Sequence, residues 1–418
     1  MTLRRRLAMG LSAALAAGAF TLTTPTPSSA EPVPAPLPAA AGDADGLAPG
    51  LTLTDLASRG EGDWLRYRIP SLTTAPNGDL LAFFDGRPSM NDLPSNITML
   101  MRRSTDGGAT WGPQQIVRQD PAPNGYGDPS VVVDREEGKV FLFYAASINQ
   151  GFAGGSTGSD PSDPNVLHAD YSVSNDNGAT WAHHRITDQI KAGKANWAGM
   201  FAAPGEGIQL RQGPHKGRLI QQYTVRISGG NYAVSVYSDD HGATWKASAP
   251  VGPGADENKT VELADGDVLL NSRAAPRRLT ARSSDGGATY TPFAADQNLP
   301  DPANNGSIIR AFPDAAPSDP RAQILLFSNT DNANVRRNLT VRMSCDSGTT
   351  WPVSRVVQTG ASAYSTLTPL ADASGELGAG GYGSSTSARA TATSRSPSST
   401  STGSGASAPR SSRAPPRS

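Results

Sequence analysis

Apolar residues recur along this chain in short runs separated by turn residues. Examples of such runs are residues 79–84, 139–144, 267–270 and 323–327. Their length and their content of Leu, Val, Ile and Phe are typical of β-strands. The dipeptides Asn77-Gly78 and Asp265-Gly266 precede two strands and are strong hairpin signals. The pattern therefore predicts an all-β protein built from hairpins.

An eight-residue unit, Ser-x-Asp-x-Gly-x-Thr followed by an aromatic residue, occurs five times. The copies occupy residues 104–111, 174–181, 238–245, 283–290 and 344–351. The Asp can accept N–H bonds within a turn, and the Gly can adopt a positive φ. Successive copies start 45 to 70 residues apart, which is the size of a four-stranded blade with its loops. The repeat therefore predicts a β-propeller.

Composition and charge narrow the class of protein. The 418 residues include 44 Gly and 34 Pro, and no apolar stretch reaches the roughly 18 residues that a membrane span requires. The single cysteine, Cys345, excludes an internal disulfide, and we expect it to be buried. Residues 31–376 carry a net charge of −9, which argues against nucleic acid as a partner.

The N-terminus has the pattern of a targeting segment. Three consecutive arginines precede an apolar stretch, and a small-residue cleavage site ends at Ala30. We expect residues 1–30 to be a signal peptide and the mature protein to be secreted. Residues 31–48 form a Pro/Ala-rich linker too poor in large apolar groups to pack. The propeller is expected to occupy residues 49–377.

A motif at the start of the predicted propeller suggests the family. The segment Tyr67-Arg68-Ile69-Pro70, followed by the five repeated turns, resembles the bacterial secreted exo-α-sialidases of glycoside hydrolase family 33, and the similarity to actinobacterial members extends over about residues 51–370. The resemblance implies a six-bladed propeller that hydrolyses terminal sialic acid from glycoconjugates.

The substrate carboxylate explains which arginines are expected. Planar guanidinium groups hold a carboxylate by bidentate, charge-assisted hydrogen bonds, and the family uses three arginines from separate blades. Arg68 corresponds to the first by its motif. Arg277 is the match for the second, with Arg278 as a competitor, and Arg342 is the match for the third.

The reacting groups follow from the same resemblance. Tyr364 matches the family's nucleophile, because a neutral phenol avoids repulsion by the substrate carboxylate. A phenol requires a base beside it, and Glu262 matches that base, with Glu206 as its rival. Asp92, on a loop, is the expected acid/base catalyst.

Two further residues are expected in the site, and no bound cofactor or metal is expected. Arg87 and Asp128 are expected to line the same pocket. The protein is expected to be a monomer that binds a sialylated glycan. A non-catalytic sialoglycan-binding propeller and a glucanase with the same turns remain alternatives, and transfer to a sugar acceptor remains open beside hydrolysis.

The C-terminus departs from the family pattern. After Leu377 the sequence contains no Leu, Ile, Val, Phe, Met or Trp and no acidic residue. We therefore expect residues 378–418 to form a low-complexity, disordered tail and the last blade to be incomplete. A natural linker could explain this composition, but a shifted reading frame is the favoured interpretation.

Overall fold

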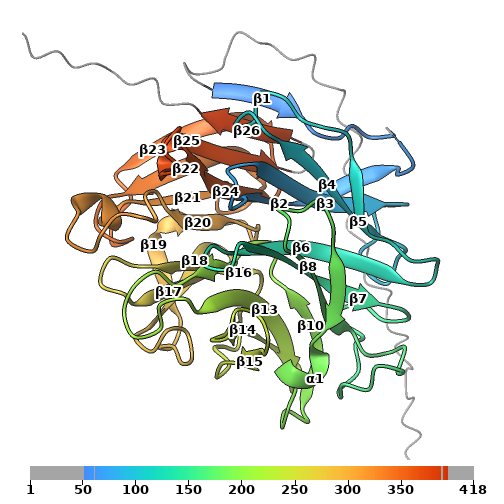
Figure 1. The fold of residues 1–418 in the computed structure, drawn as a ribbon. Helices are drawn as coiled ribbons and strands as arrows, with labels where there is room; N and C mark the ends of the chain where they lie inside the picture. The colour runs from blue at the N-terminus through green and yellow to red at the C-terminus, as the bar shows by residue number, and fades with distance from the viewer. Residues whose placement is uncertain (1–50, 61, 387–388, 394–418) are drawn as a thin grey trace, which may run out of the picture. The chain divides into compact units, whose positions relative to one another are not determined.

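The computed structural model describes residues 51–386, apart from 61, and residues 389–393. All of them belong to the larger of two compact units, which spans residues 47–418. The expected signal peptide and linker lie outside the described residues. Six sheets follow one another along the described chain, as the colours of Figure 1 show. The described part also includes a short helix, α1 (Thr187–Ile190), and a 3-10 turn, η2 (Pro320–Gln323).

The first three sheets come from the N-terminal half of the chain. The first contains β2 (Arg66–Thr74), β3 (Leu80–Arg87), β4 (Thr98–Ser104) and β5 (Gln115–Arg118). The second contains β6 (Gly125–Asp134), β7 (Lys139–Ser147), β8 (His168–Ser174), β9 (Ala182–Arg185) and the short β11 (Gly205–Glu206). The third contains β10 (Trp197–Ala202), β12 (Ile208–Gln209), β13 (Leu219–Ile227), β14 (Gly230–Ser238) and β15 (Lys246–Ala247).

The other three sheets complete the propeller. The fourth contains β16 (Asn258–Glu262), β17 (Val268–Ser272), β18 (Arg277–Ser283) and β19 (Ala294–Pro300). The fifth contains β20 (Ser307–Arg310), β21 (Leu325–Thr330), β22 (Arg337–Ser344) and β23 (Val353–Ala361). The sixth contains β24 (Ser365–Ala371), β25 (Leu377–Thr386), β26 (Arg389–Thr393) and β1 (Leu51–Asp55).

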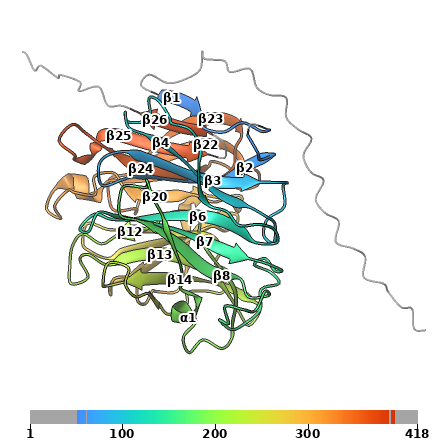
Figure 2. The ribbon, with the colours of Figure 1, turned by 45° about the vertical axis from the view of Figure 1, so that its right-hand side comes forward.

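The inner strands of the six sheets form a closed ring. β2 contacts β6, the third sheet contacts β6 and β16, β16 contacts β20, β20 contacts β24, and β24 contacts β2. The ring is joined where the two ends of the described chain meet, because β1 pairs with β26 and lies beside it in Figures 1 and 2. The predicted all-β, six-bladed propeller is confirmed.

The five repeated turns each join the third and fourth strands of a sheet. In the first copy, Thr110 donates its N–H and its hydroxyl to the Asp106 carboxylate, at 2.8 and 2.6 Å. Gly108 N–H donates to the Ser104 hydroxyl at 2.8 Å. The same bonds recur at Asp176, Asp240, Asp285 and Asp346. The hydrogen bonds from Thr110 lower the pKa of Asp106 to about 2. The carboxylate therefore stays ionised, and its hydrogen bonds keep the turn closed, at any pH well above that value.

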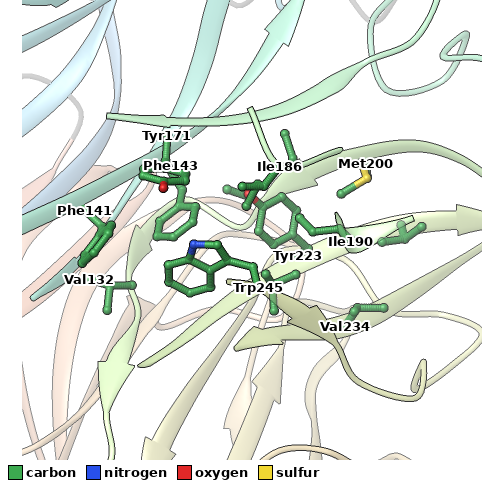
Figure 3. Close-up of a cluster of buried hydrophobic side chains, with 14 of the residues drawn as sticks. Val132, Phe141, Phe143, Tyr171, Ile186, Ile190, Met200, Tyr223, Val234 and Trp245 are labelled. Atoms are coloured by element: carbon green, nitrogen blue, oxygen red, sulfur yellow. The ribbon is translucent and has the colours of Figure 1, made fainter. Parts of the chain in front are cut away.

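The aromatic residue that ends each turn helps to join neighbouring blades. Trp181 of the second sheet packs edge-on against Phe83 of the first, with ring centroids 5.8 Å apart. Trp245 of the third sheet packs against Phe143 of the second at 5.0 Å, within the largest core cluster (Figure 3). The repeat therefore supplies inter-blade packing as well as turns. Cys345, expected to be buried, is the second residue of the last copy and is exposed.

The last blade extends beyond the expected boundary at Leu377. Residues 377–386 pair with β24 as β25, and residues 389–393 pair with β25 and β1 as β26. The expectation of disorder is therefore wrong for these two segments, while residues 394–418 lie outside the described part. Strand pairing uses backbone groups, which small residues supply as well as large ones.

The composition of β25 nevertheless leaves a gap in the packing. A cavity of ≈ 290 Å³ lies between the fifth and sixth sheets and is lined by Leu326, Val341, Met343, Leu367 and Tyr382, together with Gly383 and Ser384. Ser384 is buried, and its hydroxyl has no hydrogen-bond partner among the described residues. The last blade thus has its strands but lacks the large apolar side chains that would fill its interface.

Candidate active site

Side chains from four sheets meet at the end of the propeller where the inner strands begin. Arg68 and Asp128 lie near the starts of β2 and β6, Glu257 immediately precedes β16, and Tyr364 immediately precedes β24. Asp128 interacts electrostatically with both Glu257 and Tyr364. Residues that are nearly 300 positions apart in sequence therefore share one site.

Tyr364 lies among charged groups in this cluster. Its side chain is 7% exposed, and its hydroxyl oxygen accepts a hydrogen bond of 2.8 Å from Arg273 Nη1. The Arg336 guanidinium lies 5.7 Å from the centroid of the ring. Burial, followed by the charge of Glu257, raises the pKa of Tyr364 well above its ordinary value, although Arg273 lowers it. The phenol therefore keeps its proton at neutral pH and requires a base to act as a nucleophile.

Glu257 occupies the position of that base. Its carboxylate shares a hydrogen bond with Tyr364 and pairs with Arg273 Nη1 at 2.9 Å. Arg273 N–H also donates to the Glu257 carbonyl oxygen at 2.8 Å, which fixes the two residues opposite each other. The hydrogen-bonded group of tyrosine, glutamate and arginine is an arrangement suited to an activated phenol nucleophile.

A buried lysine lies behind Glu257. Lys259 is buried in β16, and its ammonium group donates to the Ala203 carbonyl oxygen at 3.1 Å. Burial lowers the pKa of Lys259 to about 7, against the opposing effect of Glu257.

The opposite side of the site is built around Arg87. This side chain is 1% exposed and pairs with Asp85 at 2.6 Å and Asp92 at 2.5 Å. Asp92 is 76% exposed and lies 3.5 Å from Arg68 Nη1. Burial raises the pKa of Asp85 to about 6 and that of Asp128 well above its ordinary value. Asp92 is thus the most exposed member of this group.

Two β-bulges shape the strands that carry Arg68 and Asp128. Ile69 has φ = 58° and Asp128 has φ = 65°, and each precedes a proline. The strand register shifts at both places, between Arg68 and Ser71 and between Gly127 and Ser130. A positive φ is costly for a β-branched residue such as Ile69, and bulges near a site often redirect side chains.

Glu262 is not brought to Tyr364. It is the last residue of β16, five positions beyond Glu257, which corresponds to roughly 16 Å along a strand. Its carboxylate accepts hydrogen bonds from the N–H groups of Arg211 and Gln212 and lies 3.4 Å from Arg310. Glu257, and not Glu262, is therefore the glutamate that lies beside Tyr364. The rival, Glu206, accepts a hydrogen bond from Thr73 and lines the same distant cavity as Glu262.

Two of the three arginines expected to bind the substrate carboxylate are instead held by other groups of the protein. Arg277 donates to the Gln297 carbonyl oxygen at 2.6 Å on an exposed edge. Its competitor Arg278 is buried against Asp301 at 2.6 Å. Arg342 is buried against Asn329 and Asp331. These side chains are held by structural partners, and the guanidinium groups beside Tyr364 are those of Arg273 and Arg336.

The register of one hairpin contains the signal that points to Glu257. The Asp265-Gly266 turn joins β16 to β17, and Asn258 lies opposite Ser272. Extending that register by one residue pairs Glu257 with Arg273 at the end remote from the turn. Glu262 lies next to the turn, opposite Val268. Counting outward from the turn therefore separates the two glutamates.

The described residues form neither a metal-binding cluster nor a membrane-spanning helix. In residues 51–386 (without 61) and 389–393, no group of three or more His, Cys, Asp or Glu side chains is arranged to hold a metal ion. None of the helices in that part of the chain is long and apolar enough to cross a membrane.

Known proteins share this combination of fold and sequence. Residues 78–378 match the family described as BNR repeat-like domain. A sialidase from Micromonospora viridifaciens is 56% identical over 333 residues, which are 78% of this chain and 51% of that protein. The chain thus spans about half the length of this curated relative.

Solved structures of sialidases also resemble this chain. A Hadza microbial sialidase superposes with a TM-score of 0.73 at 28% identity, covering 82% of this chain and 68% of that one. Trypanosoma rangeli sialidase, in complex with 2,3-difluorosialic acid as a covalent intermediate, gives a TM-score of 0.63 at 19% identity, covering 83% and 59%. At that identity the second likeness shows the fold alone.

The fold and the site together define the class. This is a six-bladed propeller with self-capping Asp turns and a rim that combines arginines, carboxylates and a buried tyrosine. The chain belongs to the BNR repeat-like domain family and is a homologue of the sialidases.

Proposed function

We propose that this protein is an exo-α-sialidase that hydrolyses terminal sialic acid from glycoproteins, glycolipids and oligosaccharides. The observation that carries the proposal is the contact of Tyr364 with both Glu257 and Arg273 at the rim of the propeller. A buried phenol beside a carboxylate and a guanidinium suits an anionic sugar, which would repel a carboxylate nucleophile. The 56% identity to a sialidase supports the same reaction.

Three arginines would hold the substrate carboxylate. Arg273 and Arg336 approach Tyr364 from the fourth and fifth sheets, and Arg68 approaches from the first. Arg273 is oriented by Glu257 and Asp256, at 2.9 and 3.4 Å. Guanidinium groups fixed in this way lose little freedom when a carboxylate binds.

The first chemical step forms a bond to Tyr364. The tyrosine oxygen attacks the anomeric carbon as the bond to the leaving group breaks, and Glu257 accepts the phenol proton. Asp92 donates a proton to the departing oxygen, and its 76% exposure is consistent with contact with that part of the substrate.

The second step regenerates the enzyme. Water attacks the anomeric carbon and gives one proton to Asp92. As the bond to Tyr364 breaks, Glu257 returns to the tyrosine oxygen the proton that it accepted in the first step. Two displacements at one carbon retain its configuration. Arg87 would hold Asp92 in place through the ion pair at 2.5 Å, and Asp128, whose pKa burial raises well above its ordinary value, would border the pocket.

Two properties of the whole protein belong to the same proposal. The charged start, the apolar stretch and the cleavage site ending at Ala30 support secretion. We also propose that the protein acts as a monomer, because the inner strands close into a ring within one chain.

A fluorogenic assay tests the proposal. The purified protein should release 4-methylumbelliferone from its sialoside, and Tyr364→Phe should remove most of that activity. A matched Tyr237→Phe variant, on β14 away from the site, should keep it. Sialyl-ligand binding without release of the fluorophore would favour the non-catalytic propeller instead.

A further inference from the structure

The opposite end of the propeller holds a second polar cavity. Two adjoining hollows of ≈ 90 and ≈ 310 Å³ are both lined by Arg135, Arg211 and Arg310, with Gln209 and Pro313. These residues lie at or beyond the ends of inner strands β6, β12 and β20. The group around Tyr364 lies where the inner strands begin, so the two sites are separated by the length of these strands.

Arg135 is a cation without an ion-pair partner in this cavity. It is only partly exposed. The hydrogen bond described for its side chain is a donation from Nη2 to the Thr74 carbonyl oxygen at 2.7 Å, while its backbone N–H donates to Gln209 Oε1 at 2.8 Å. None of the described acidic groups lies within ion-pair distance of it. Burial and then the charge of Arg211 lower its pKa to about 10. An enclosed, unpaired guanidinium is unfavourable unless an anion accompanies it.

The two other arginines keep hydrogen-bonding capacity. Arg310 is buried, lies 3.4 Å from Glu262 and donates to the Ala315 carbonyl oxygen, but its Nε has no partner among the described residues. Arg211 pairs with Asp314, and its positive charge acts on both Arg135 and Arg310. Arg211 is thus within electrostatic reach of both Arg135 and Arg310, and all three guanidinium groups line the same two hollows.

Glu206 and Glu262 line the smaller hollow, of ≈ 90 Å³, and neutralise the charges of the three arginines incompletely. Burial raises the pKa of Glu206 to about 8, so this group is mostly protonated at pH 7. Glu262 already accepts the N–H groups of Arg211 and Gln212. In the smaller hollow, three guanidinium groups therefore meet two carboxylates, of which Glu206 is mostly protonated at pH 7, and Glu136 and Asp314 line the adjoining hollow.

We propose that this cavity is a binding site for a small oxyanion, a phosphate or a carboxylate, held by Arg135, Arg211 and Arg310 and separate from the sialic acid site. Guanidinium groups bind such anions by paired, charge-assisted hydrogen bonds, and a partly enclosed cavity strengthens them. The inference does not depend on the proposed sialidase activity.

Calorimetric titration with inorganic phosphate at pH 7 tests this site. Arg135→Met should weaken phosphate binding at least tenfold and leave sialoside hydrolysis within twofold of the parent protein. Arg282→Met is the matched control, because Arg282 is exposed and pairs with Asp265 and Asp267 outside both sites, and it should bind phosphate as the parent does. Equal binding by the parent and Arg135→Met would overturn the proposal.

A second measurement does not depend on the folding of that variant. Crystals of the unmodified protein soaked in selenate should give an anomalous peak between Arg135 and Arg310. Displacement of this peak by acetate would support a general oxyanion site, and displacement by phosphate alone would support a phosphate site. A peak only beside Arg273 and Arg336 would refute the second site.

Discussion

The glutamates at the two ends of β16, Glu257 just before the strand and Glu262 as its last residue, offer a matched pair of substitutions. Glu257→Gln removes the carboxylate that contacts Tyr364 and Arg273, while Glu262→Gln makes the same change at the other end of the strand. Loss of a general base typically costs about 10²–10⁴-fold in rate, or roughly 3–5 kcal/mol in the activation barrier. We expect Glu257→Gln to lose kcat in that range.

Glu262→Gln should behave differently because its carboxylate is roughly 16 Å away along the strand. It should keep kcat within about threefold of the parent. It weakens a buried ion pair with Arg310 and charge-assisted bonds from two backbone N–H groups, so we expect a loss of about 1–3 kcal/mol in the free energy of unfolding.

Initial rates with the 4-methylumbelliferyl sialoside and urea unfolding curves measure the two effects. Both variants should be assayed at saturating substrate and at a temperature where each is folded. The reasoning would be refuted if Glu262→Gln lost as much kcat as Glu257→Gln, or if Glu257→Gln retained full activity.

Three further predictions concern single side chains. Arg336→Gln should raise KM at least tenfold because the guanidinium faces Tyr364, whereas Arg342→Gln should leave KM unchanged and lower stability through its buried bonds to Asn329 and Asp331; similar KM values for the two variants would contradict this. The Lys259 pKa of about 7 in the folded protein lies below the 10.5 of the ordinary side chain, so the unfolded chain binds more protons between these values and stability should rise with pH across that window. Lys259→Met should flatten that rise in urea unfolding curves, and an unchanged slope would count against the assignment. Ser384→Val should stabilise the protein by about 1 kcal/mol, measured as thermal unfolding, because it removes an unpaired buried hydroxyl beside the cavity of the last blade; a lower Tm would show that the cavity cannot accept the side chain.

The propeller could be predicted because its signal is local and repeated. Each turn carries its Ser, Asp, Gly and Thr within a few positions, and the bonds that they form are all within the turn. Arg68 lies on β2, Asp92 follows the paired strand β3 by five residues, and Tyr364 directly precedes the inner strand β24. For these residues, proximity in sequence carries most of the information.

The remaining positions depend on which end of a strand faces the site. Glu257 precedes a five-residue strand that Glu262 ends. Likewise, Arg336 precedes β22, whereas Arg342 lies in its interior. Residue type does not distinguish the members of each pair, whereas hairpin register does. The strands β25 and β26 were not predicted for another reason. Most of their residues are small, and the strands are held by backbone pairing.

The tyrosyl intermediate is the part of the proposal that a single measurement can test most directly. The protein should be incubated with 2,3-difluorosialic acid, digested, and its peptides analysed by mass spectrometry. If Tyr364 is the nucleophile and Glu257 its base, we expect one fluorosialyl adduct on the peptide that contains Tyr364, and none in Glu257→Gln under the same conditions. An adduct on a carboxylate, or no adduct in an active preparation, would contradict it.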